Sequence, residues 1–147
     1  MESAEILRVF DEESLRRCLE IREKVFVMEK KVPKEVERDT YDRLEGRCDH
    51  FLIRNQGEDA GALRCLYIEE NIVKIQRFCI LREWRGKGVG KQAVKYIEKY
   101  YHSRNVKKIE MDAKYEAVGF YEACGYEKVS DIFIEADKKH ITMRKNI

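Results

Sequence analysis

A chain of 147 residues with 44% apolar and 39% charged side chains is long enough for one domain with one core and too short for two. Its 30 basic and 28 acidic side chains leave a net charge of +2, which lacks the basic excess of nucleic-acid-binding proteins and predicts no nucleic-acid partner. No apolar run approaches the roughly 18 residues of a membrane-spanning helix, and MESAEILRVF lacks the basic and apolar blocks of a secretory signal. We therefore expect a single cytoplasmic domain over 1–147 with no membrane partner.

The first expected elements are a short β-branched strand at 6–10 and a helix at 11–30, which opens with acidic and serine caps and ends before Pro33. Arg22 and Glu29 fall on or near the apolar stripe of that helix, where an unpaired charge is costly. These two residues form either a partly exposed pair at the helix edge or part of a pocket wall.

Residues 32–48 are expected to form a long loop, and loops of this length in compact domains often bind ligands. An antiparallel meander with turns at Gly57 and 70–71 should follow. The later elements are, in order, strands at 50–55, 60–70 and 71–81, a helix at 90–104, a strand at 106–114, a helix at 115–124 and two strands within 126–145. The strand–helix–strand unit near residue 90 predicts a parallel strand pair with a right-handed crossover, and the whole order predicts an α/β fold with a mostly antiparallel sheet.

The five cysteines are an odd number with no CxxC spacing, which argues against a disulfide scaffold and against a zinc site. They are Cys18, Cys48, Cys65, Cys79 and Cys124. We expect reduced thiols and no metal.

The segment REWRGKGVGKQ, residues 82–92, holds three of the eight glycines. A Walker A loop would need glycine at Arg85 and a hydroxyl at Gln92, so that motif fails at both ends. The dinucleotide-binding pattern G-x-G-x-x-A does match at 88–93, and Glu110 lies near the position of a ribose-binding acid. A dinucleotide-binding oxidoreductase is therefore an alternative, although a meander precedes these glycines where that fold has alternating strands and helices.

A third pattern, R-x-x-G-x-G, comprises Arg85, Gly88 and Gly90. The first N–H groups of a helix have no internal partner and attract anions, so this turn can hold a diphosphate. The same glycines would also suit a tight turn with close helix packing, and the turn alone does not distinguish these two interpretations.

The segment IQRFCILREWRGKGVGKQAVKYIEKYY followed by AVGFYEACGYEKV resembles the GNAT superfamily of acetyl-CoA-dependent N-acetyltransferases. The second segment looks like that family's F-Y-x-x-x-G-[FY] signature, and it follows the glycine turn at the usual distance. A weaker likeness extends to IREKVFVMEKKVP and HITMRK. The resemblance implies a GNAT fold, with a mixed, mostly antiparallel sheet, splayed central strands and flanking helices.

The resemblance also implies where acetyl-CoA binds. The diphosphate-binding residues would be Arg85, Gly86, Lys87, Gly88, Val89 and Gly90, with Lys91 adding charge nearby. The splayed strand would present Phe78, Cys79 and Ile80 to the pantetheine amides, with Phe120 completing the cofactor site. The Cys79 thiol is expected to be a small apolar group and not a nucleophile. Relatives often have a polar amide after the strand that ends in Ala113-Lys114, so Lys114 could instead meet a cofactor phosphate or be solvated.

The family signature makes Tyr121 the general acid, although without the resemblance it would be taken as a core aromatic. The general base is left open among Glu110, Glu29 and His140, and the substrate-side residues are Arg22, Glu29 and His140. The acceptor is expected to be a primary amine, either on a small molecule or on a protein lysine, and a homodimer is common among similar proteins. A non-catalytic acyl-CoA sensor is the other alternative.

Overall fold

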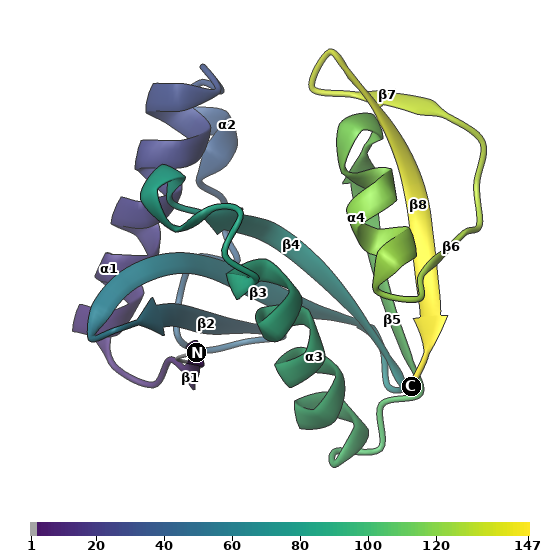
Figure 1. Cartoon of the computed structure of the whole chain (residues 1–147), viewed down its shortest axis with the longest axis horizontal. Coiled ribbons are helices and arrows are strands. Elements are labelled where there is room, and N and C mark those ends of the chain that lie inside the picture. The colour runs from purple at the N-terminus through teal and green to yellow at the C-terminus, as the bar shows by residue number, and fades with distance from the viewer. Residues whose placement is uncertain (1–2) are drawn as a thin grey trace.

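The computed structural model describes residues 3–147 and consists of a twisted sheet with helices on both faces (Figure 1). The N-terminal elements are β1 (Glu5–Arg8), α1 (Glu12–Arg22) and a π-helical continuation (Glu23–Glu29). This confirms the expected strand and helix. The π-helical turn is visible in the hydrogen bond from Lys30 N–H to the Val25 carbonyl oxygen, five residues back. The expected long loop contains one short helix, α2 (Lys34–Glu37), which its charged sequence did not reveal.

The antiparallel meander is confirmed, with both turns at the expected places. It comprises β2 (Cys48–Asn55), β3 (Glu58–Glu69) and β4 (Ile72–Ile80). The crossover helix α3 (Val89–His102) then leads to β5 (Lys108–Lys114), and β5 pairs with β4 in parallel, as predicted.

The C-terminal part has three strands where two were expected. A 3-10 turn (Tyr115–Ala117) and α4 (Val118–Ala123) are followed by β6 (Glu127–Lys128), β7 (Phe133–Glu135) and β8 (Lys138–Asn146). The helix stops before Gly125, whose φ of +94° suits a residue without a Cβ. The strand order is β1-β2-β3-β4-β5-β8-β6, and β7 pairs with β8 as a hairpin.

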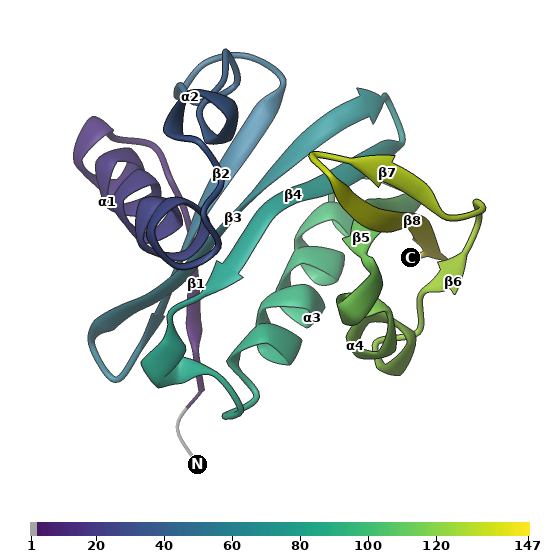
Figure 2. The same ribbon diagram turned by 90° about the horizontal axis from the view of Figure 1, so that it is seen from above.

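Two apolar clusters hold the helices against the sheet. On one face α3 buries Val89, Ala93, Val94, Ile97 and Tyr101, which recur at helical spacing, and α4 packs beside it. Each large apolar side chain buried in this way contributes about 1.5–3 kcal/mol. On the opposite face α1 packs on β2, β3 and β4, as the view from above shows (Figure 2). No helix in the part of the chain from residue 3 onward is long and apolar enough to cross a bilayer.

The two central strands separate after a short parallel contact. The β4–β5 register runs only from Ile72–Lys108 to Ile75–Met111, whereas β3 accompanies β4 as far as Ile80. A register shift in the β3–β4 ladder marks a bulge, and Arg77 within it has a φ of +53°. The edge of β4 over residues 76–80 that faces β5 therefore has no strand partner, and the strands diverge there (Figure 1).

Candidate functional site

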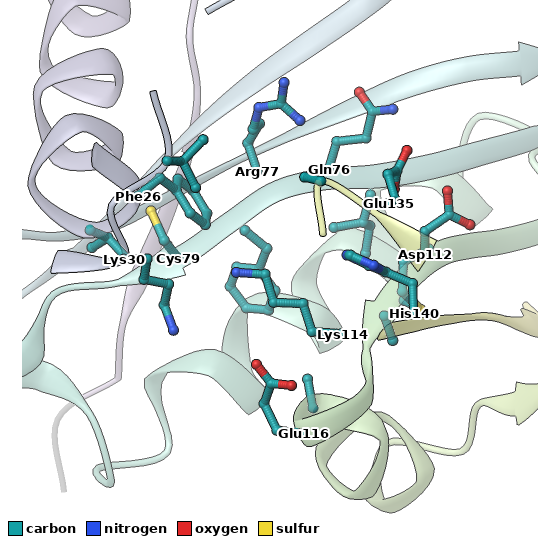
Figure 3. Close-up of a pocket in the computed structure, with 18 of the residues that line it drawn as sticks. Phe26, Lys30, Gln76, Arg77, Cys79, Asp112, Lys114, Glu116, Glu135 and His140 are labelled. Carbon is teal, nitrogen blue, oxygen red and sulfur yellow. The ribbon is translucent and has the colours of Figure 1, made fainter. Parts of the chain in front are cut away.

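A cavity of about 680 Å³ occupies the space between the diverging strands. Its walls come from the open stretch of β4, the end of β5, the π-helical turn, α4 and the β7–β8 hairpin. The side chains at its centre and rim include Phe26, Lys30, Gln76, Arg77, Cys79, Asp112, Lys114, Glu116, Glu135 and His140 (Figure 3). A cavity of this size, mixing apolar walls with a few convergent polar groups, is typical of a ligand site.

The glycine turn borders this cavity at the N-terminus of α3. Gly86 and Gly88 have φ values of +74° and +81°, which L side chains rarely adopt. A Cβ on Gly90 would lie 3.4 Å from the Phe120 ring, so this glycine allows close packing as well. Within residues 3–147, no short, well-aligned hydrogen bond engages the backbone N–H groups of residues 86–91. The turn therefore offers a row of free donors at the positive end of a helix dipole.

The positive charge of Arg85, which was expected to assist anion binding at this turn, is paired with a carboxylate of the protein. Arg85 forms a bidentate ion pair with Glu29, and its Nε donates to the Ile80 carbonyl oxygen at 2.8 Å. The Arg85 guanidinium lowers the pKa of the Glu29 carboxyl by hydrogen bonding. Glu29 thus lies at the glycine turn, away from the acceptor side of the cavity where we expected it.

Arg22 lies outside the cavity as well. It is 1% exposed, and its guanidinium donates to Glu37 Oε2 at 2.8 Å and to Asp42 Oδ1 at 2.7 Å. Arg22 and Glu29 therefore neither pair with each other nor share a pocket wall. Arg64 also binds Asp42, so a buried ion network anchors the loop between α2 and β2 to α1 and β3. This geometry does not fit the expected placement of Arg22 on the substrate side of the cavity.

Glu110 is 7% exposed on β5, and Arg144 on β8 donates to its Oε1 from Nε at 3.1 Å and from Nη2 at 2.7 Å. It does not line the cavity. A carboxylate engaged in this way has little freedom to take a proton from a substrate in the cavity.

Tyr121 and His140 both reach the cavity. Tyr121 is 8% exposed, and burial raises the pKa of its phenol, so the hydroxyl remains protonated at neutral pH. His140 is 7% exposed and stacks on Phe133 with 5.8 Å between ring centroids. The 2.9 Å contact between His140 Nδ1 and the Lys138 carbonyl requires Nδ1 to carry the hydrogen, because a carbonyl oxygen only accepts. Nε2 has no hydrogen-bond partner in the described part of the chain.

Cys79 lines the cavity, and burial raises the pKa of its thiol to about 12. The thiol therefore stays protonated and is a poor nucleophile. Phe78 and Ile80, its neighbours on β4, also line the cavity, as do Arg85, Gly90 and Phe120.

Several cavity residues had no signal in the sequence. Asp112 forms a 2.6 Å ion pair with Lys74, and Glu135 lies at the tip of the short β7–β8 hairpin, which the sequence analysis did not resolve. Phe26 could have been predicted as a cavity residue, because it lies on the apolar stripe of the first helix.

An unpartnered strand edge beside a helix N-terminus with free N–H groups fits an extended ligand that ends in a diphosphate, which is the arrangement expected of a coenzyme A-dependent acyltransferase. The family model for the acetyltransferase (GNAT) domain matches residues 7–147, so the chain belongs to the GNAT acetyltransferase family.

Known proteins agree with this assignment. The chain is 31% identical over 142 residues to the "Uncharacterized protein YyaT" of Bacillus subtilis (strain 168), covering 97% of this chain and 95% of YyaT. It is 32% identical over 137 residues to the "Uncharacterized N-acetyltransferase YjcF" of the same organism, covering 92% and 95% of the two chains. The crystal structure of an acyl-CoA N-acyltransferase from Pseudomonas aeruginosa is similar with a TM-score of 0.83, 25% identity and 99% coverage of both chains. The protein is thus a GNAT N-acetyltransferase, a class that uses acetyl-CoA and acetylates amines.

Proposed function

We propose that this enzyme transfers an acetyl group from acetyl-CoA to a primary amine by direct attack, with both substrates bound together in the cavity between β4 and β5. The observation that carries this proposal is the separation of the two strands beyond Ile75 and Met111, directly beside the free N–H groups that begin α3. One end of this space suits an extended thioester donor, and the other remains open to an acceptor.

The residues of the glycine turn and of the open edge of β4 fit acetyl-CoA, the acetyl donor. The N–H groups of residues 86–91 would bind the diphosphate, with Lys87 and Lys91 adding positive charge and Arg85 shared with Glu29. The open edge of β4 at Phe78, Cys79 and Ile80 would pair with the pantetheine amides, as an added strand would. When bound, acetyl-CoA supplies the activated acyl group.

Two side chains would carry out the proton transfers, His140 on β8 and Tyr121 on α4. An amine acceptor with a pKa of about 10.4 is protonated at neutral pH and needs a base before it can attack. His140 Nε2 would accept that proton, because the hydrogen on Nδ1 is held by the Lys138 carbonyl. Tyr121 Oη would donate a proton to the departing sulfur, and the raised pKa keeps this proton available.

The acceptor end carries negative charge that favours an amine. Glu135 lines the cavity near His140 and forms no ion pair within residues 3–147, whereas Asp112 is neutralised by Lys74 (Figure 3). A primary amine, whether on a small molecule or on a protein lysine, arrives as a cation and is attracted to Glu135.

Two measurements test the proposal. Isothermal titration should detect binding of acetyl-CoA and none of NAD, which separates the acetyltransferase from a dinucleotide-binding enzyme. Release of the coenzyme A thiol should then be measured with a panel of small amines and lysine peptides. Binding of acetyl-CoA without thiol release by any amine would favour the non-catalytic sensor instead.

A further inference from the structure

Lys114 is the last residue of β5, three positions beyond the final β4–β5 pair at Met111. At this point β5 has separated from β4, while its other edge still pairs with β8, where Lys114 lies opposite His140. Its Nζ lies 5.5 Å from the centroid of the Phe26 ring, which belongs to the π-helical turn on the other side of the cavity. The lysine therefore extends across the space between the two halves of the site (Figure 3).

This ammonium group lacks the partner that neighbouring cations have. Lys74 pairs with Asp112 and Arg85 pairs with Glu29, but Lys114 forms no salt bridge within residues 3–147. The aromatic face of Phe26 is a weak substitute for a carboxylate. The proposed mechanism gives no role to this cation.

The surroundings of Lys114 shift its amine toward the neutral form. Burial lowers the pKa of the Lys114 ammonium, and the positive charge of Lys30 lowers it further, while Glu116 opposes the shift. Lys138 adds a second, weaker repulsion. A larger fraction of this amine is thus neutral than of an exposed lysine, and only the neutral form is nucleophilic.

We propose that Lys114 is itself an acetyl acceptor, so that the enzyme acetylates its own cavity when no external amine is bound. The inference rests on the proposed function, because the donor must lie along the open edge of β4, opposite this residue. The Nζ lone pair forms a C–N bond with the acetyl carbon, and the C–S bond breaks. The sulfur leaves with the bonding electrons, and a proton equivalent to the one lost from Nζ returns to it. The products are N-acetyl-lysine and coenzyme A thiol, with no oxidant or reductant required.

The modification would change the site that carries it. An acetylated Lys114 has no charge and places a neutral amide between β5 and the Phe26 ring. External amines would compete with Lys114 for the same acetyl group, so their presence should protect the lysine.

The test incubates the full chain with acetyl-CoA and no amine, and measures intact mass and acetylated peptides over time. We expect the mass of one acetyl group to be added, located at Lys114, at a first-order rate that does not depend on protein concentration. The variant Lys114→Arg keeps the charge and should lose this modification completely. The matched variant Lys95→Arg, which changes an exposed lysine on α3 outside the cavity, should retain it.

Chemical acetylation by the thioester is separated from self-acetylation with heat-unfolded protein, in which Lys114 should react no faster than other lysines. An unmodified Lys114, or one acetylated equally fast in folded and unfolded chains, would overturn the inference. If acetyl-CoA binds and amines are acetylated while Lys114 stays unmodified, only this inference fails. If acetyl-CoA does not bind at all, the proposed function fails with it.

Discussion

Glu29 and Arg85, 56 positions apart in the sequence, form a bidentate ion pair with Oε2 2.6 Å from Nη1 and Oε1 2.9 Å from Nη2. The pair joins the π-helical turn to the glycine turn and places a carboxylate beside the proposed diphosphate site. The arginine expected to bind the cofactor is therefore already paired with a protein carboxylate.

Glu29→Gln should release Arg85 and remove a negative charge near the diphosphate. Since exposed ion pairs contribute little, we expect the Kd for acetyl-CoA to fall by about fivefold or less. Turnover at saturating acetyl-CoA should not change. Titration calorimetry and steady-state kinetics measure these effects, with Glu20→Gln, whose ion pair with Arg16 is exposed, as the control. Loss of turnover in Glu29→Gln would instead identify Glu29 as the general base.

Tyr121→Phe removes the proposed proton donor and keeps the ring. Because general acid catalysis typically contributes a factor of about 10² to 10⁴, kcat should drop by at least about 100-fold. Tyr126→Phe is the matched control, since its hydroxyl donates to Glu98 on α3 and it does not line the cavity. That change should lower the thermal midpoint and leave kcat nearly intact. Full thiol release by Tyr121→Phe would rule out the assignment.

His140→Gln tests the proposed base. Because a positioned base typically contributes a factor of about 10² to 10⁴, the variant should be slower by that factor. The measurement is kcat at saturating acetyl-CoA and amine, and His102→Gln, at the exposed end of α3, should behave like the wild type. An unchanged kcat in His140→Gln would assign the role of base to another group.

Asp42 should make stability depend on acidity. Burial alone would raise the pKa of Asp42, but hydrogen bonds from Arg22 lower it to about 2, below the ordinary value of 3.8. A depressed folded pKa stabilises the protein above the unfolded value, and this contribution is lost as the pH falls toward the folded value. Urea unfolding should therefore lose roughly 2 kcal/mol between about pH 4 and pH 2.

The variant Asp42→Asn should lack this part of the dependence, and Asp131→Asn, at an exposed position, should keep it. Identical pH profiles for Asp42→Asn and the wild type would show that the buried ion network does not depend on this carboxylate.

The local elements of this protein could be predicted from the sequence because period and turn chemistry fix them. The helical spacing of α3, the glycines that begin it and the two turns of the meander are all local patterns, and the structure confirms each. The parallel pairing of β4 and β5 followed from the handedness of a strand–helix–strand unit. The short helix α2 and one of the three C-terminal strands were not predicted, because segments of two to four residues carry too little periodicity.

The choice of partner for each charged side chain was made by the tertiary structure. Glu110 and Asp112 lie on the same face of β5, yet the register with β8 sets Arg144 opposite Glu110 and Thr142 opposite Asp112. One carboxylate is thereby withdrawn from the cavity, and the other lines it. Residue type and spacing determine which face a side chain takes, but Coulomb energy depends on distances that only long-range packing sets. For that reason the glycine turn and the tyrosine of the family signature could be recognised in the sequence. Only the fold decided the positions of Arg22, Glu29, Lys114 and His140.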